Sequence, residues 1–150
     1  MAFSFSKLLG NKTSESKLET NDTIEAIISD VENKPFGVSD TNVLFAGLNE
    51  LGGYFFFQTV IVGQLYVKSK TGAELLFKGK NFELKLKADM PEFESDHSPL
   101  KGRHITKIDF QIEESDIEDL ENAKLHSITI HLKKQNILFT KYNIATDEEE

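Results

Sequence analysis

The strongest pattern along the chain is a run of aromatic and β-branched residues from Tyr54 to Val67, which is apolar on both faces of an extended segment. Successive side chains of a strand point to opposite faces, so this run predicts a strand covered on both sides. One face is typical of a protein core: Phe55, Phe57, Thr59, Ile61, Leu65 and Val67. The other mixes rings, aliphatic side chains and amides: Tyr54, Phe56, Gln58, Val60, Val62, Gln64 and Tyr66. We expect a helix of the same chain, a partner protein or an apolar ligand to cover this second face, and Gly63 to mark a bulge.

Before this segment the apolar positions follow the period of a helix. A helix is predicted over residues 23 to 33, capped by Asp22, because apolar side chains recur there at the spacing of one helical face: Ile24, Ile27, Ile28 and Val31. A second helix is predicted from residue 39 or 40 to Gly52–Gly53, because three leucines share one side of it: Leu44, Leu48 and Leu51.

After Gly53 the period becomes two, which is typical of strands with one buried and one solvent-facing side. Alternation is clear over residues 82 to 87 and 107 to 113, and hairpin turns are predicted at Ser69–Gly72 and Lys78–Asn81. A last hairpin is predicted over residues 127 to 142. The expected fold is α+β and mainly antiparallel β, with one or two N-terminal helices followed by about six strands in a curved, barrel-like meander; a β-sandwich is the alternative.

The two ends of the chain differ from the middle in composition. Residues 1 to 20 combine an apolar leader with a polar stretch typical of a flexible linker, and the leader is either a frayed end or an anchor that docks on the domain or on a partner. Residues 21 to 146 are expected to form a single globular domain, and residues 147 to 150 an acidic tail.

Composition narrows the function classes. The 150 residues contain no cysteine, which excludes disulfides, thiolate metal sites and cysteine nucleophiles. The net charge of -8 and a single arginine, Arg103, argue against nucleic-acid binding. The longest apolar run is shorter than the roughly 20 residues of a membrane helix, and the N-terminus has no persuasive signal peptide, so we expect a cytoplasmic protein without a membrane span.

Two polar clusters are candidates for function. The first is a run of acids without a base, which either favours the start of a short helical turn or docks a basic partner: Glu113, Glu114, Asp116, Glu118, Asp119 and Glu121. The second lies in the irregular connection from residue 88 to 103 and the strand after it: Glu94, Asp96, His97 and His104. Carboxylates and imidazoles of this kind can bind a divalent ion or act as general acid and base. Their spacing matches no known motif, so we expect no metal and no cofactor and assign no catalytic residue.

The remaining two histidines do not suggest a shared site. His126 is in phase with the inward set of its predicted strand, whereas His131 falls on the opposite face. Phosphate-binding, dinucleotide and serine-nucleophile motifs are absent from the sequence.

The leading hypothesis is a non-catalytic cytoplasmic binding module, of small acidic adaptor or inhibitor type. It would work by contact with a partner protein, or by self-association, through the second face of the aromatic strand, the acidic run, or both. The first alternative is a carrier of a small apolar ligand in the curved sheet, lined by Phe56, Val60, Val62 and Tyr66. The second is a metal-assisted hydrolase that uses Glu94, His97 and His104.

Overall fold

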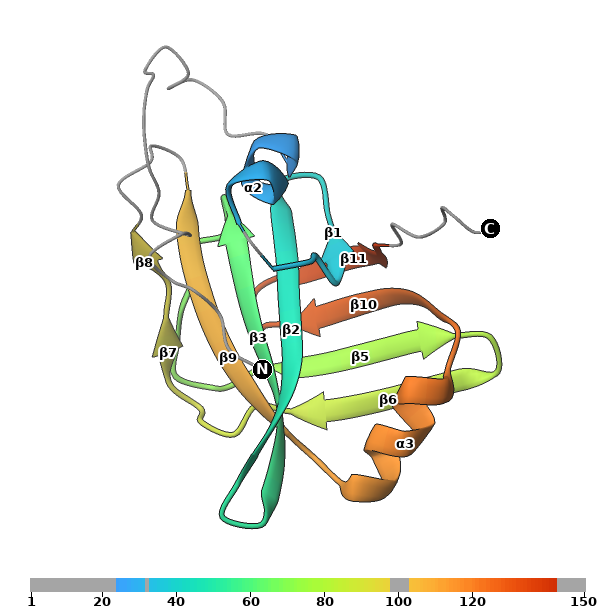
Figure 1. Ribbon diagram of the computed structural model, residues 1–150. Coiled ribbons are helices and arrows are strands. Elements are labelled where there is room, and N and C mark those ends of the chain that lie inside the picture. Colours follow the sequence, from blue (N-terminus) through green and yellow to red (C-terminus); the bar gives the residue numbers. More distant parts are fainter. Residues whose placement is uncertain (1–23, 32, 98–102, 143–150) are drawn as a thin grey trace, which may run out of the picture.

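Figure 1 shows the computed structural model, which describes residues 24–31, 33–97 and 103–142. The predicted leader, linker, helix cap at Asp22 and acidic tail lie outside the described residues. Within the described ranges the chain forms two helices and eleven strands. In chain order they are α2 (Ile24–Asp30), β1 (Gly37–Val38), β2 (Asn42–Leu51), β3 (Tyr54–Gly63), β4 (Lys68–Ser69), β5 (Glu74–Gly79), β6 (Phe82–Lys87), β7 (Phe93–Glu94), β8 (Asp96–His97), β9 (His104–Ile112), α3 (Glu114–Asn122), β10 (Leu125–His131) and β11 (Asn136–Lys141).

Nine of the strands form one antiparallel sheet in the order β6-β5-β10-β11-β1-β2-β3-β9-β8, and β4 and β7 form a separate two-stranded sheet. The large sheet curls, so that β2, β3 and β9 run at a steep angle to β5, β6 and β10 (Figure 1). An isolated bridge between Ala88, just after β6, and Phe110 of β9 brings distant parts of the sheet together. The predicted mainly antiparallel, curved sheet is confirmed as a half-barrel, and one continuous sheet takes the place of the alternative sandwich. The predicted meander of about six strands is wrong, because the described residues form eleven strands and their order in the sheet does not follow the sequence.

The second predicted helix is wrong, because residues 42–51 form strand β2. Gly52 and Gly53 have positive φ angles of 63° and 86°, which make them the two-residue turn of a hairpin instead of a helix C-cap. Leu51 and Tyr54 pair directly across this turn. A separation of four residues returns to the same face of a strand as well as of a helix, so Leu44 and Leu48 did not discriminate between the two.

Three other local predictions change. The predicted Ser69–Gly72 hairpin is not formed, because β4 pairs with β7 and not with β5. The turn between β5 and β6 is confirmed. Its residue with a positive φ angle is Asn81, at 53°, and not Gly79. Helix α3 lies between β9 and β10, is nine residues long instead of a single turn, and has no side-chain cap hydrogen bond at Glu113. Neither described helix is long and apolar enough to cross a membrane.

The inner face of the half-barrel is filled by the protein's own side chains. Phe57 and Phe77 meet edge to face with centroids 5.2 Å apart, and Phe36 packs against both. The core-type face of the aromatic strand is confirmed here, since Phe57 and Ile61 join this cluster and Thr59 donates a 2.7 Å hydrogen bond to the carbonyl of Ile108. Leu120 anchors α3 to the same cluster.

Helix α2 covers the outer face of the sheet at one end of β2 and β3 (Figure 1). Its Ile27 is fully buried in a second apolar cluster that contains Phe45 and Val60. An ion pair of 3.2 Å between Nη1 of the buried Arg103 and Oδ2 of Asp30 ties the end of α2 to the residue before β9. The helix predicted at 23 to 33 is therefore confirmed over Ile24–Asp30, and the sheet rather than helix propensity holds it.

Candidate functional site

The second face of the aromatic strand is divided into parts with different surroundings. Val60 and Val62 are 2% and 0% exposed and lie in the cluster under α2, as expected for cover by a helix of the same chain. Tyr54, at the other end of β3, is 71% exposed, and Phe56 is half-buried. The chain's own helix therefore covers this face at Val60 and Val62 and leaves Tyr54 exposed. The carrier alternative loses Val60 and Val62 as lining residues, because they face away from the inside of the half-barrel.

The exposed part lies where the β2–β3 hairpin extends past the rest of the ribbon (Figure 1). Leu51 is 68% exposed and faces Tyr54 across the glycine turn. We call residues 50–56 the hairpin end. Scattered exposed leucines need no explanation, but two large apolar side chains paired at the tip of a hairpin form a ready contact surface. The sequence pattern placed Leu51 on a predicted helix and not at a contact surface, although its position next to Gly52–Gly53 is a signal for a hairpin tip.

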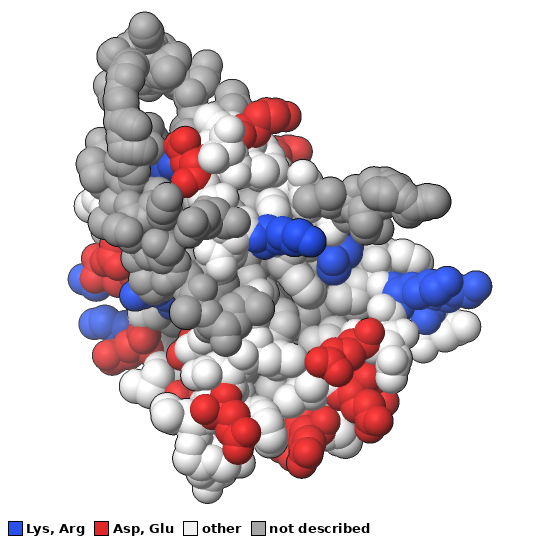
Figure 2. Space-filling model, viewed as in Figure 1, with Lys and Arg blue, Asp and Glu red and all other residues white. Residues whose placement is uncertain are grey.

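Acidic side chains lie beside this end of the molecule. Ile112, the last residue of β9, pairs with Phe55, so the acids that follow start beside the hairpin end. Five of the six predicted acids are exposed and Asp116 is half-buried: Glu113, Glu114, Asp116, Glu118, Asp119 and Glu121. Figure 2 shows acidic side chains (red) gathered over α3 and beside the β2–β3 hairpin. Basic side chains (blue) lie beyond α3 at the right edge of the view. We call Glu113 and α3 together the acidic helix.

The structure brings together two of the four residues of the predicted polar cluster and connects a third through Tyr66. His97 and His104 are direct partners in the β8–β9 ladder, with ring centroids 4.9 Å apart. Tyr66 stacks on His97 at 5.3 Å, meets His104 edge to face at 5.2 Å, and donates a 3.2 Å hydrogen bond to Oε2 of Glu94. Asp96 precedes His97 in the strand and points to the other face.

Electrostatics in this histidine cluster favours neutral groups. Burial, and then the charge of neighbouring His97, lower the pKa of His104. The hydrogen bond to Glu94, followed by the carboxylate's charge, raises the pKa of the Tyr66 phenol. Nδ1 of His104 is buried and has no hydrogen-bond partner within the described part of the chain. Sequence reasoning placed Tyr66 on the second face and missed its contact with the histidines. The predicted bulge at Gly63 is wrong, because β3 pairs with β2 and β9 without a register shift and ends at Gly63.

The serine next to the histidine cluster in sequence, Ser95, is buried and hydrogen-bonded. Ser95 is 3% exposed and its hydroxyl is shared with Thr106 at 2.6 Å and with the backbone N–H of Val67 at 2.9 Å. These bonds fix the segment before β4 against β9, which is a structural role. Among the described residues, no group of three or more histidine, aspartate or glutamate side chains is placed to hold a metal ion.

The other two histidines take no part in this cluster. A β-bulge between Leu125 and Ser127 takes His126 out of the β10 ladder, so it is exposed and not inward-facing as its phase predicted. Nδ1 of His131 lies 2.9 Å from Oδ1 of Asn136 across the hairpin turn.

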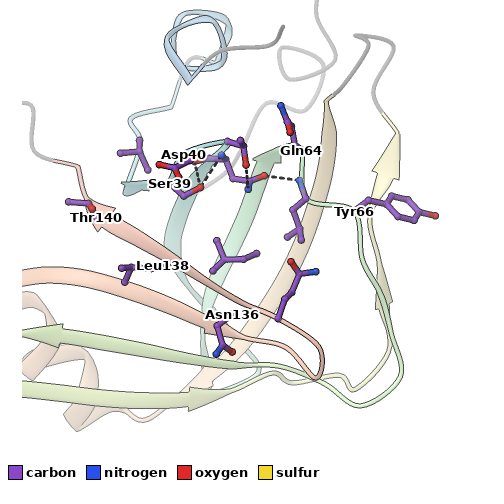
Figure 3. A pocket seen from close by; sticks show the side chains of 13 residues that line it. Ser39, Asp40, Gln64, Tyr66, Asn136, Leu138 and Thr140 are labelled. Carbon is purple, nitrogen blue, oxygen red and sulfur yellow. Dashed lines mark hydrogen bonds between the residues drawn. The ribbon is translucent and has the colours of Figure 1, made fainter. Parts of the chain in front are cut away.

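An open hollow of about 840 Å³ lies between the turn before β2 and the start of β11. Figure 3 shows polar side chains such as Ser39, Gln64 and Asn136 at its edge, whereas Tyr66 turns away from it. Its polar edge is unlike the mostly apolar, enclosing wall that holds a small apolar ligand. Comparison of the chain with protein-family models, with curated proteins and with solved structures finds no match.

Proposed function

We propose that the protein is a non-catalytic binding module whose hairpin end and acidic helix together contact a positively charged protein partner. The observation that carries the proposal is the pair of side chains at the hairpin end, Leu51 and Tyr54, which are 68% and 71% exposed beside a run of acids. Apolar anchors inside a charged rim are the usual anatomy of a protein interface.

The charges favour a basic partner over a second copy of the chain. The whole chain carries a net charge of -8, and residues 113–122 hold six acids and no base. Two copies that met through this end would bring like charges together, which costs affinity. A basic partner would instead be attracted over a distance of about 10 Å at 0.1 M salt.

The apolar pair supplies the short-range part of the contact. Burial of a leucine or tyrosine side chain that was exposed is worth about 1.5 to 3 kcal/mol. Tyrosine is also among the residues that most often dominate the binding energy of an interface. The two side chains stand on paired strands that end in a tight turn, so little conformational freedom is lost on binding.

The test combines affinity capture with direct binding. The full chain and its Tyr54→Ala variant are used to capture proteins from lysate, and any protein retained by the first but not the second is purified and titrated against both. Leu138→Ala is the matched control, because Leu138 is 60% exposed on β11 and lies outside the hairpin end. We expect Tyr54→Ala to weaken the purified complex at least about 10-fold and Leu138→Ala to leave it unchanged.

The acidic helix is tested separately with a triple variant, Glu113→Gln, Glu114→Gln and Glu118→Gln. Its expected effect is slower association and a weaker dependence of affinity on salt. Glu83→Gln, an exposed acid on β6, is the control and is expected to change neither quantity. The proposal is overturned if Tyr54→Ala and Leu138→Ala behave alike, if nothing is retained, or if light scattering shows a dimer that Tyr54→Ala abolishes.

A further inference from the structure

We propose that His97 and His104 form a two-imidazole site for a divalent transition-metal ion of the zinc, nickel and copper class. The site lies at the Gly63 end of β3, since His104 pairs with Gly63 as well as with His97. The hairpin end is at the opposite end of the same strand. The inference therefore stands independently of the proposed partner contact.

The separation of the two rings fits such an ion. Directly opposed residues of an antiparallel pair have neighbouring side chains on one face. Two imidazoles that bind one tetrahedral ion through N–metal bonds of about 2.0 Å have their ring centroids about 5 Å apart. The centroids of His97 and His104 are 4.9 Å apart, with ring planes at 60°.

A second observation concerns a ring nitrogen of the pair. Nδ1 of His104 is buried without a hydrogen-bond partner in the described ranges, which is unfavourable for a polar atom. Buried polar atoms of native proteins are nearly always satisfied, and an orphaned one calls for an explanation such as a water or an ion. The arrangement is also braced, because Tyr66 packs on both rings and is itself hydrogen-bonded to Glu94.

The donor type sets the class of ion. Imidazole nitrogen suits zinc, copper and nickel, whereas calcium and magnesium prefer oxygen ligands. No third histidine or carboxylate completes the site within residues 24–31, 33–97 and 103–142. Water or a group from a bound molecule would fill the remaining positions, so binding is expected to be weaker than at a closed four-ligand site.

The test is calorimetric titration of the full chain, free of any histidine tag and treated with a chelator, with nickel chloride, zinc chloride and magnesium chloride. His97→Phe is the key variant, since it keeps an aromatic ring against Tyr66 but removes the ligand nitrogens. His126→Ala, at an exposed histidine outside the cluster, is the control. Imidazole NMR signals provide a second readout, because paramagnetic nickel broadens the signals of the residues that bind it.

We expect one nickel or zinc ion per chain, broadening confined to His97 and His104, and no response to magnesium. His97→Phe is expected to weaken binding at least about 10-fold while the unfolding temperature stays close to that of the parent protein. His126→Ala is expected to change nothing. The proposal is overturned if millimolar nickel and zinc give no binding, if His97→Phe binds as well as the parent protein, or if broadening centres on His126 or His131.

Discussion

A single substitution, Ile27→Ala, is expected to weaken the packing of α2 against strand β3. Ile27 is fully buried between the helix and the sheet. The change removes three carbon atoms, whose transfer from water is worth about 2.4 kcal/mol at about 0.8 kcal/mol each. With the cavity term included, the expected loss in the free energy of unfolding lies at about 2 to 5 kcal/mol. Ser29→Ala, at an exposed position of the same helix, is the control and is expected to stay within about 0.5 kcal/mol of the parent protein.

We expect Ile27→Ala to destabilise the packing of α2 more than it destabilises the domain as a whole. Helix α2 has seven residues, and isolated helices shorter than about 12 residues are marginal in water, so α2 depends on its packing. The backbone N–H of Val31 bonds to the carbonyl of Ile27 at 3.2 Å and reports on the helix. We expect its protection from hydrogen exchange to fall about 50-fold, as a loss of about 2.4 kcal/mol requires.

Urea denaturation measures the effect on unfolding of the whole domain, whereas exchange at Val31 measures the opening of α2 alone. The decrease in the free energy of global unfolding cannot exceed the free energy that holds α2 on the sheet. Undocking would expose Val60 and Val62 and extend the apolar surface of β3. The reasoning is refuted if Ile27→Ala matches Ser29→Ala both in exchange at Val31 and in urea stability.

Three further predictions concern the elements that hold the sites in place. Gly63→Ala is expected to lower the free energy of unfolding, measured by urea denaturation, by about 2 to 4 kcal/mol. The reason is that φ is 154° there and a Cβ would overlap the carbonyl oxygen of Thr41. A decrease below about 1 kcal/mol would contradict this. Asn42→Ala is expected to cost about 1 to 3 kcal/mol, since Oδ1 of the buried Asn42 accepts a 2.9 Å bond from the N–H of Leu65; unchanged stability would show that water replaces the amide. Burial raises the pKa of Asp109 above its ordinary value of 3.8, so the folded state holds this proton more tightly than the unfolded state and loses stability as the pH rises through the raised pKa. Asp109→Asn is therefore expected to be more stable than the parent protein at pH 7, by less than about 1 kcal/mol for a solvent-screened group, but not at pH 3; equal differences at both pH values would refute the assignment.

Local pattern was a good guide where neighbours in the sequence decide the structure. The face of α2 could be predicted because its isoleucines repeat at helical spacing. The hairpin of β10 and β11 could be predicted because alternation and a polar turn agree, and Ile128 and Ile130 are indeed fully buried. The split of the aromatic strand into a core face and a second face held as well, because the register of one strand determines both faces.

Pattern failed where a pairing distant in the sequence decides the structure. Strand β2 is buried on both sides over Asn42–Phe45, because one face meets the core and the other meets α2. Alternation therefore disappears there, and leucine spacing can be mistaken for a helix. The contact of Tyr66 with His97 and His104 could not be predicted from the sequence for a related reason. It depends on β8 pairing with β9 and on the chain leaving β3 at Gly63.

The length of β3 keeps the two proposed sites apart. The strand has ten residues from Tyr54 to Gly63, so its ends are about 30 Å apart at about 3.4 Å per residue, and α2 covers Val60 and Val62 toward the Gly63 end. Groups so far apart with no shared partner influence each other little. An ion at the histidine pair would therefore act on the segments that carry Tyr66 and His97, and not on the hairpin end. Coupling between the two sites would require a part of the protein that contacts both and has two alternative positions, whereas α2 packs only on the Gly63 end of β3.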